Sequence, residues 1–318
     1  MKSLKGVARS VCSTGMNRMH HIAALAVVLL LLTPPAEGIV RRHDRDDARY
    51  LEYGARFKAV ARIGGPPPNP EGTGTLIAPQ WVLTAGHVGD GISMRTPLPD
   101  VEFLDRRYEI EAIHVHPCFR GAHPAHDLAL ISLRQPVADV TPIAVYRDSA
   151  EVGRVATLVG SGFSGTGLTG PRREFWDHRK RAATNRIEGV EAFWISFTFD
   201  PPATATDLEG FPGAGDSGGP DLIEVDGTFY VAGVESGSGD SNHNGVTGDY
   251  GDRVRHTRVS SELRWIDATM AGRQVAVQCY DQLRGVKRVA SIVLAAVGGL
   301  ALGLWFWRSQ LSGAPAGY

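Results

Sequence analysis

Three polar side chains in separate segments have the types that nucleophilic catalysis needs. Ser217 lies in the glycine-rich run 215–220, His87 follows a short apolar stretch that closes with Thr84-Ala-Gly, and Asp127 stands directly before another apolar stretch. A serine hydroxyl is a weak nucleophile until a base takes its proton, and the base needs a third group that fixes its tautomer. The three segments therefore supply a base, an orienting acid and a nucleophile, in the chain order His, Asp, Ser.

The glycine-rich run also suits a site that stabilises negative charge. Its sequence, Gly-Asp-Ser-Gly-Gly-Pro, favours a sharp turn that exposes the serine hydroxyl. In such a turn the backbone N–H groups of Gly215 and Ser217 can point at one developing oxyanion. Other histidines precede Asp127, but none of them follows a strand with the lead-in that His87 has; they are His114, His116, His123 and His126.

The elements that must position these residues are mostly strands. Short apolar stretches interrupted by Gly, Pro and Asp clusters predict an all-β body. One helix is predicted over 260–271, where Leu263, Ile266 and Met270 share a face. The 38 glycines among 318 residues agree with a turn-rich fold. The predicted strands are 75–78, 81–84, 128–133, 155–159, 192–199, 228–234 and 257–260.

Charge excludes one broad class of function. The chain has 33 Lys and Arg residues against 34 Asp and Glu residues, which gives a formal net charge of −1. A protein that binds nucleic acid in general would carry a basic excess. We therefore expect no nucleic-acid partner, and we also expect no cofactor and no metal.

Together these segments resemble the chymotrypsin/trypsin-like serine proteases, and the pattern is similar to that of the bacterial members. The resemblance covers nearly all of residues 39–270 and implies two six-stranded antiparallel β-barrels with a short C-terminal helix. It implies a serine endopeptidase with polypeptide substrates, in which His87 is the base, Asp127 orients it and Ser217 attacks. The matching stretches are 72–87, 126–131, 215–220, 233–236 and 257–266.

The resemblance also implies residues that bind substrate. Phe211 stands six residues before Ser217, where a trypsin-type pocket carries an acid at its floor, so cleavage after basic residues is not expected. Ser236 belongs to the stretch that resembles the strand pairing with substrate. Ser238 falls near the pocket wall, where glycine is usual, and this predicts a narrow pocket for apolar or small side chains.

Cysteine usage departs from the family pattern. The usual cysteines beside the active histidine and before the nucleophile are Val88 and Gly213 here. Cys118 and Cys279 remain in the predicted body and linker. Whether these two pair depends on a geometry that spacing alone does not decide.

Activation in this family commonly uses a new N-terminus, typically Ile-Val, whose ammonium pairs with the aspartate beside the nucleophile. Here Ile39-Val40 follows a predicted cleavage site, and the aspartate is Asp216. We therefore predict an Ile39–Asp216 salt bridge created by removal of the signal peptide itself. The charged run 41–44, Arg-Arg-His-Asp, departs from the glycine pair that usually follows.

Residues 1–38 are predicted to be a signal peptide. A basic stretch precedes the apolar run 22–32, which is short for a membrane span, and Ala36-Glu-Gly38 places small residues at the cleavage positions. An uncleaved signal anchor is the alternative. Export of the body follows from either interpretation.

The other end of the chain predicts a membrane anchor. Residues 289–307 contain no charge over 19 positions and carry Trp305 and Trp307 near one end. We expect a linker at 271–288, a transmembrane helix at 289–307 and a tail at 308–318. Basic residues before the helix alone would orient the body inward, but the export signal outweighs them, so the body is expected on the extracytoplasmic side. The alternative for this run is a buried core helix.

Three further alternatives stay open. The pattern Gly215-x-Ser217-x-Gly219 also fits the nucleophile elbow of α/β-hydrolases, an esterase fold, although Pro220 opposes the helix that such an elbow needs. A catalytically impaired protease fold that only binds partners is the second. The third is a calcium loop at 240–252, where oxygen-bearing side chains alternate, although the glutamate expected at its end is missing and a solvated turn fits better.

Overall fold

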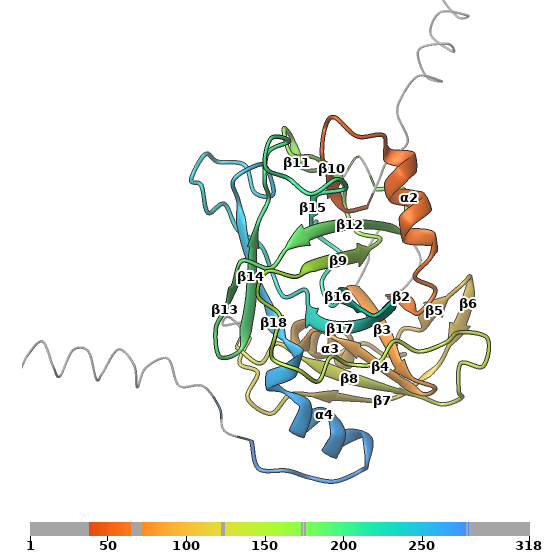
Figure 1. Cartoon of the computed structure of the whole chain (residues 1–318). Coiled ribbons are helices and arrows are strands. Elements are labelled where there is room, and N and C mark those ends of the chain that lie inside the picture. Colours follow the sequence, from red (N-terminus) through yellow and green to blue (C-terminus); the bar gives the residue numbers. More distant parts are fainter. Residues whose placement is uncertain are drawn as a thin grey trace, which may run out of the picture.

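The fold is built from two large sheets and one small one (Figure 1). The computed structural model describes residues 38–64, 72–121, 125–172, 174, 176–277 and 279. Each large sheet has seven strands, all paired antiparallel, and the small sheet has four. The sequence predicted six strands in each unit; the extra segments are short hairpin arms at the sheet edges, β6 and β13.

The first large sheet delivers His87 and Asp127 to the same place. In its order β6-β5-β2-β3-β4-β8-β7, strands β4 and β8 pair so that Thr84 lies opposite Ala129. The loops that carry His87 and Asp127 therefore leave the sheet side by side. The strands are β2 (Val60–Ile63), β3 (Gly72–Ala78), β4 (Trp81–Thr84), β5 (Val101–Phe103), β6 (Arg106–Tyr108), β7 (Ile110–Val115) and β8 (Ala129–Leu133).

The second large sheet places Ser217 beside Ser236 in the same way. Its order is β12-β9-β16-β17-β18-β14-β13, and Pro220 of β16 lies opposite Val234 of β17. The segments before β16 and after β17 therefore emerge together. The strands are β9 (Val155–Gly160), β12 (Arg181–Arg186), β13 (Gly189–Val190), β14 (Trp194–Thr198), β16 (Pro220–Val225), β17 (Thr228–Val234) and β18 (Arg253–Arg258).

The small sheet buries the start of the described chain. Val40 pairs with Gly165 on one side and with Phe211 on the other, and Ile39 and Val40 are fully buried. The Ser164 hydroxyl also donates to the Ile39 carbonyl at 2.6 Å. The order is β11-β10-β1-β15, with β1 (Val40–Arg41), β10 (Gly165–Thr166), β11 (Gly170–Pro171) and β15 (Gly210–Phe211).

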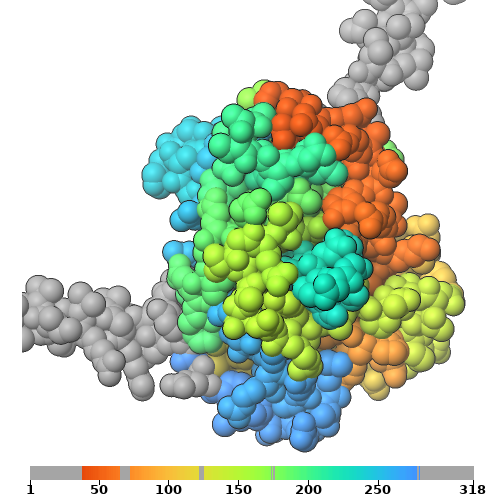
Figure 2. Space-filling view, viewed as in Figure 1, coloured from red at the N-terminus to blue at the C-terminus, as the bar shows by residue number. Residues whose placement is uncertain are grey.

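Within the described residues, the helices that accompany the sheets are α2 (Asp47–Ala55), α3 (Gly86–Ser93) and α4 (Leu263–Met270), the last after a 3-10 turn at Val259–Ser261. Only α4 was predicted. Helix α2 is joined to β12 by the buried Arg181 side chain, which binds Asp47 at 2.7 Å. In Figures 1 and 2 this red-orange segment accordingly lies against green segments from later in the chain.

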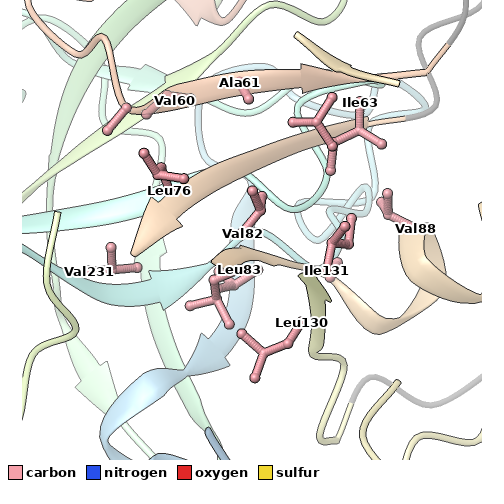
Figure 3. Close-up of a cluster of buried hydrophobic side chains, with 14 of the residues drawn as sticks. Val60, Ala61, Ile63, Leu76, Val82, Leu83, Val88, Leu130, Ile131 and Val231 are labelled. Atoms are coloured by element: carbon pink, nitrogen blue, oxygen red, sulfur yellow. The ribbon is translucent and has the colours of Figure 1, made fainter. Parts of the chain in front are cut away.

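The buried core holds the strand ends that carry the site. Figure 3 shows Val88, which follows His87, in one apolar cluster with Leu83 and Ile131. Packing of Val88 fixes the start of α3 and so the position of the His87 backbone. Val231 of the second sheet belongs to the same cluster, so the two large sheets share part of a core.

Two predicted segments cannot be followed in this fold. Residues 1–37 of the predicted signal peptide and the predicted transmembrane segment 289–307 lie outside the described residues. Within the described ranges, no helix has the length and apolar character needed to cross a membrane.

Candidate active site

His87 is positioned by the first turn of α3. Ala85 caps the helix in an extended conformation, and His87 is half-buried at its second residue. Its ring Nδ1 lies 2.8 Å from Asp127 Oδ2, and its backbone N–H donates to Asp127 Oδ1 at 2.7 Å. A carboxylate that receives Nδ1–H leaves Nε2 as the free acceptor, which is the tautomer a general base needs.

Asp127 is buried and fully engaged. Besides His87, the Ser236 hydroxyl donates to Asp127 Oδ2 at 2.5 Å, and the Thr257 hydroxyl donates to the Asp127 carbonyl at 3.0 Å. Gly86 makes this approach possible, since a Cβ there would lie 3.0 Å from Asp127 Oδ1. Asp127 is thus held by His87, which follows β4 of the first large sheet, and by Ser236 and Thr257, which follow β17 or belong to β18 of the second.

Ser217 lies in the loop between β15 and β16, at the junction with the first sheet. Its carbonyl accepts from the Thr73 N–H at 2.8 Å. A Cβ on Gly72 would lie 2.7 Å from Val88 and 2.9 Å from the Ser217 carbonyl oxygen, so the Ser217 backbone is next to the residue that follows His87. Within the described chain, however, no hydrogen bond joins the Ser217 hydroxyl to the His87 ring. Such contacts are often loose without substrate and tighten when it binds.

The backbone around Ser217 leaves two donors unused. Gly215 has φ of +97°, a conformation that favours glycine. The neighbouring N–H groups of Asp216, Gly218 and Gly219 all donate to backbone carbonyls. Among the described residues, no hydrogen bond takes the N–H of Gly215 or of Ser217. These are the two donors from which the sequence predicts an oxyanion hole.

Comparison with known proteins decides the family. The trypsin family profile, described as "Trypsin", matches residues 54–266, which is more than half of the chain.

The chain belongs to the trypsin family.

Individual relatives are distant. Vitamin K-dependent protein C from Mus musculus and from Rattus norvegicus is 26% identical over 227 residues, covering 64% of this chain and 47% of the relative. The rabbit protein, from Oryctolagus cuniculus, is 25% identical over 239 residues and covers 63% and 47%. This trypsin-family chain therefore spans about half the length of those relatives.

A solved structure supports the same fold. Neuropsin, described as a serine protease expressed in the limbic system of mouse brain, superposes with a TM-score of 0.54 at 19% identity, covering 68% of this chain and 96% of neuropsin. At that identity the likeness shows the fold alone. The predicted double β-barrel with a short C-terminal helix is confirmed, and the α/β-hydrolase alternative is wrong, since strand β16 and not a helix follows Ser217.

A cleft of about 540 Å³ opens beside His87 and Asp127 in this trypsin-family site. Ser236 and Ser238, which the sequence predicts to bind substrate, line this cleft. Phe211 does not line it; this ring is fully buried in β15 and stacks on Phe199 with centroids 5.7 Å apart. Pairing of β15 with β1 turns Phe211 into the core, a long-range effect that counting back from Ser217 misses. The full lining is His87, Gly121, Asp127, Ser236, Gly237, Ser238, Gly239, Ser241, Arg253 and Arg255.

Asp216 is fully buried beneath the Ser217 loop. Its carboxylate accepts from the N–H of Gly162 at 2.6 Å and of Gly213 at 2.8 Å. Burial raises the pKa of Asp216 to about 6, while these two N–H groups and that of Ile39 oppose the rise. The backbone N–H of Ile39 thus lies at the Asp216 carboxylate, while the salt bridge from a free Ile39 ammonium stays a prediction.

Glu235 is a buried acid that sequence reasoning missed. It is 1% exposed, and its backbone binds the Ser217 loop, accepting from the Gly218 N–H and donating to the Gly219 carbonyl. Among the residues that the structure describes, neither carboxyl oxygen has a hydrogen-bond partner. Burial raises the pKa of Glu235 well above its ordinary value, and the negative charges of Asp216 and Asp221 add to the rise.

A second buried cluster lies behind Asp127. Glu262 binds His126 Nδ1 at 2.8 Å and faces His116 Nε2 at 3.3 Å, and the two rings stack with centroids 4.9 Å apart. Burial disfavours the charged carboxylate, but the two histidines outweigh it and lower the pKa of Glu262 to about 2. His126, the residue before Asp127, has φ of +61°, so the cluster fixes a strained backbone next to the orienting acid.

Glu262, His116 and His126 are also residue types that bind metal ions. Among the described residues they form a group whose ligand atoms lie within 4.8 Å of one another. The hydrogen bonding opposes a metal. The Cys118 N–H donates to His116 Nδ1 at 3.2 Å, so a neutral His116 ring carries its proton on Nε2. That nitrogen, which faces Glu262 Oε2 at 3.3 Å, then carries a proton and has no lone pair for a metal.

Two other motifs from the sequence are now placed. Cys118 and Cys279 form a disulfide with Cα atoms 5.1 Å apart, which ties the segment after α4 to the loop after β7. The loop 240–252 is bound by its own backbone: Asp240 accepts from the Gly245 N–H at 2.8 Å, and Asp252 accepts from the Gly248 N–H at 2.6 Å. Both carboxylates thus accept hydrogen bonds from backbone N–H groups of the same loop, and Asp252 is fully buried.

Proposed function

We propose that the chain is a serine endopeptidase that hydrolyses peptide bonds through an acyl-enzyme intermediate. The observation that carries the proposal is the His87–Asp127 pair at 2.8 Å in a trypsin-family fold whose loop 215–220 lies against the residue after His87. Ser217 attacks the substrate carbonyl, and His87 takes the hydroxyl proton and then gives it to the leaving amine. Asp127 keeps the His87 tautomer and stabilises the imidazolium that forms.

The unused N–H groups support the charge-stabilising step. As Ser217 attacks, the carbonyl oxygen becomes an oxyanion, and the N–H groups of Gly215 and Ser217 donate to it. Donors that are already oriented need no rearrangement during the reaction, and one such donor contributes about 10²–10³ in turnover. The Gly215 conformation and the backbone bonds around Asp216 hold this geometry.

Substitution of the nucleophile tests the proposal. Ser217→Ala should lower peptide hydrolysis by on the order of 10⁶ while thermal unfolding stays unchanged, since only a hydroxyl is lost. Ser149→Ala, on the exposed surface, is the matched control and should keep full activity. A Ser217→Ala protein that retains a tenth of the original rate would overturn the assignment.

One observation favours a second candidate, a protease fold that binds partners without hydrolysis. In the described chain, the Ser217 hydroxyl makes no hydrogen bond to His87, so the base and nucleophile are not yet engaged. The two candidates differ in reactivity toward a peptide substrate. Hydrolysis that depends on both His87 and Ser217 would exclude the binding-only function.

We propose further that Ile39 is the mature N-terminus and that its ammonium pairs with Asp216. Burial of Ile39 and Val40, together with the Ile39 N–H near the Asp216 carboxylate, supports this pairing. Removal of one partner of a buried charge pair costs about 3–5 kcal/mol. N-terminal sequencing of active enzyme should begin at Ile39; full activity in a form with an extra residue before Ile39 would contradict it.

Export and membrane attachment are part of the same proposal. The basic and apolar segment 1–38 supports export, and the charge-free run 289–307 supports an anchor that leaves the peptidase body on the extracytoplasmic side. Cell fractionation should find the full-length chain with membranes. Deletion of residues 280–318, which keeps Cys279, should release active protein, and a full-length chain in the soluble fraction would refute the anchor.

A further inference from the structure

Two arginines form the charged rim of the cleft beside His87. Arg253 and Arg255 line it, and the other charged residue in the lining, Asp127, is buried and bound to His87 and Ser236. The two guanidinium groups are therefore the solvent-facing charged groups among the described lining residues besides the His87 ring, and each is paired with a glutamate outside the lining. A volume of about 540 Å³ lies in the range of ligand-binding clefts, roughly 300–1,000 Å³.

The strand that carries the arginines fixes their direction. Along β18, Arg253 and Arg255 are exposed while Val254 and His256 are buried, the alternation of a strand with one face on the core. Pairing with β14 places Arg255 opposite Ser196. The two guanidinium groups therefore stand on one face of the sheet, the face that borders the cleft.

Neighbouring side chains hold the arginines without using all their donors. Arg255 contacts Glu191 at 3.1 Å and lies over the Trp194 ring, 5.9 Å from its centroid. Arg253 contacts Glu188 at 3.0 Å. Each guanidinium has five N–H donors, and both side chains are more than half exposed (56% and 57%), so donors remain for a ligand.

The segment beside the arginine strand leaves room for a side chain, since Ser238 pairs with Val254 of β18 and lies between two glycines. The segment after β17 alternates serine and glycine, Ser236-Gly-Ser-Gly239, and a Cβ at Gly237 or Gly239 would meet nothing within 4 Å. A larger residue at Gly237 would stand in this open space. The two glycines therefore place no side chain in the open space next to the strand that carries the arginines.

We propose that Arg253 and Arg255 select substrates with an aspartate or glutamate within a few residues of the cleaved bond. Guanidinium forks match carboxylates with two parallel hydrogen bonds, and the carboxylate would share donors with Glu188 and Glu191. The inference rests on the proposed peptidase function and names its substrate class. It adds a charge requirement to the apolar or small preference expected from the pocket residues.

A peptide library and matched peptide pairs test this. Cleavage of the library by the purified full-length chain should enrich Asp and Glu at one position near the cleaved bond. Peptides that differ only by Asp or Asn at that position should then differ roughly tenfold in kcat/KM, the scale of one charge-assisted hydrogen bond. Arg253→Gln/Arg255→Gln should bring this ratio near one with the Asn peptide almost unaffected, and Glu191→Gln should raise it.

The control variant is Arg134→Gln, because Arg134 is also exposed and paired with a glutamate, at 3.2 Å, but does not line the cleft. It should leave the ratio unchanged. Cleavage with equal rates for the Asp and Asn peptides would overturn the inference and leave the peptidase function intact. Absence of all cleavage would count against the peptidase function; equal affinity of the full-length chain for Asp- and Asn-containing library peptides, measured by titration, would then overturn the inference by itself.

Discussion

Two buried glutamates flank the site and have opposite surroundings. Glu262 lies behind Asp127 between two histidines, and its pKa falls to about 2. Glu235 lies behind the Ser217 loop with no hydrogen-bond partner and two carboxylates nearby, and its pKa rises well above its ordinary value. Both side chains are almost completely buried. Burial alone therefore does not decide the charge of a buried acid; the partners do.

The difference separates two ways of supporting a catalytic residue. The Glu262 carboxylate is paired with two histidines, and its bond to His126 joins the start of α4 to the residue before Asp127. Glu235 instead supports the nucleophile loop through its backbone, while its side chain has no partner for a negative charge. The first arrangement should therefore gain stability from ionisation of its acid, and the second should lose it.

The largest expected effect on stability comes from removal of the Glu262 carboxylate. Glu262→Ala should lower the free energy of unfolding by about 3–5 kcal/mol, because it leaves two buried imidazoles without their acceptor. Glu262→Gln keeps the shape and should cost less, about 1–3 kcal/mol. Chemical denaturation measures both. Glu109→Gln, an exposed partner of Arg134, is the control and should change stability by under about 0.5 kcal/mol.

The same variant has a defined pH dependence. A lowered folded-state pKa contributes stability that is present above the unfolded value near 4.5 and is lost as pH falls toward 2. The stability advantage of the original protein over Glu262→Gln, about 1–3 kcal/mol above pH ~5, should thus be lost on acidification toward pH 2. An advantage that stays constant with pH would contradict the ionised cluster.

A smaller effect of opposite sign is expected at Glu235. A raised folded-state pKa gives stability that is present below the unfolded value and is lost as pH rises through the folded one. Glu235→Gln should therefore be stabilising at pH 8, by roughly 1–2 kcal/mol, and close to neutral at pH 4. Urea denaturation at the two pH values measures this difference.

The exposed Glu224 on strand β16 provides the matched control for Glu235. Glu224→Gln should be nearly neutral at both pH values. If Glu235→Gln is equally destabilising at pH 4 and pH 8, the carboxyl has a partner that outweighs the repulsion, and the comparison between the two glutamates fails.

Much of this fold could be predicted from local sequence patterns. Alternating and apolar stretches predicted most long strands, and the apolar face at 263, 266 and 270 predicted α4, observed as Leu263–Met270. Helix α3 was missed because its eight residues include two interior glycines, and packing of Val88 and Ile92 into the core outweighs that weak propensity. Helix α2 was missed too, since its contact with Arg181 is a long-range ion pair.

The candidate site shows the same contrast between residues with a local sequence signal and residues without one. His87, Asp127 and Ser217 are each marked by adjacent residues, so the sequence could single them out as candidates. Phe211 was predicted at a pocket floor by counting, but pairing of β15 with β1 places it in the core. Residues that only the tertiary fold brings together gave no local signal in the sequence. They are the Glu262 cluster, which joins positions 136 residues apart, and Glu235, Arg253 and Arg255.

Covalent labelling of Ser217 tests the central claim most directly. A fluorophosphonate probe reacts only with a serine hydroxyl that a base activates beside oxyanion donors, so it reads out the assembled site without a known substrate. The purified full-length chain should be labelled at Ser217 alone, as mapped by mass spectrometry, and His87→Ala should abolish the labelling. A folded chain that stays unlabelled, or one labelled at Ser217 equally well without His87, would contradict the account.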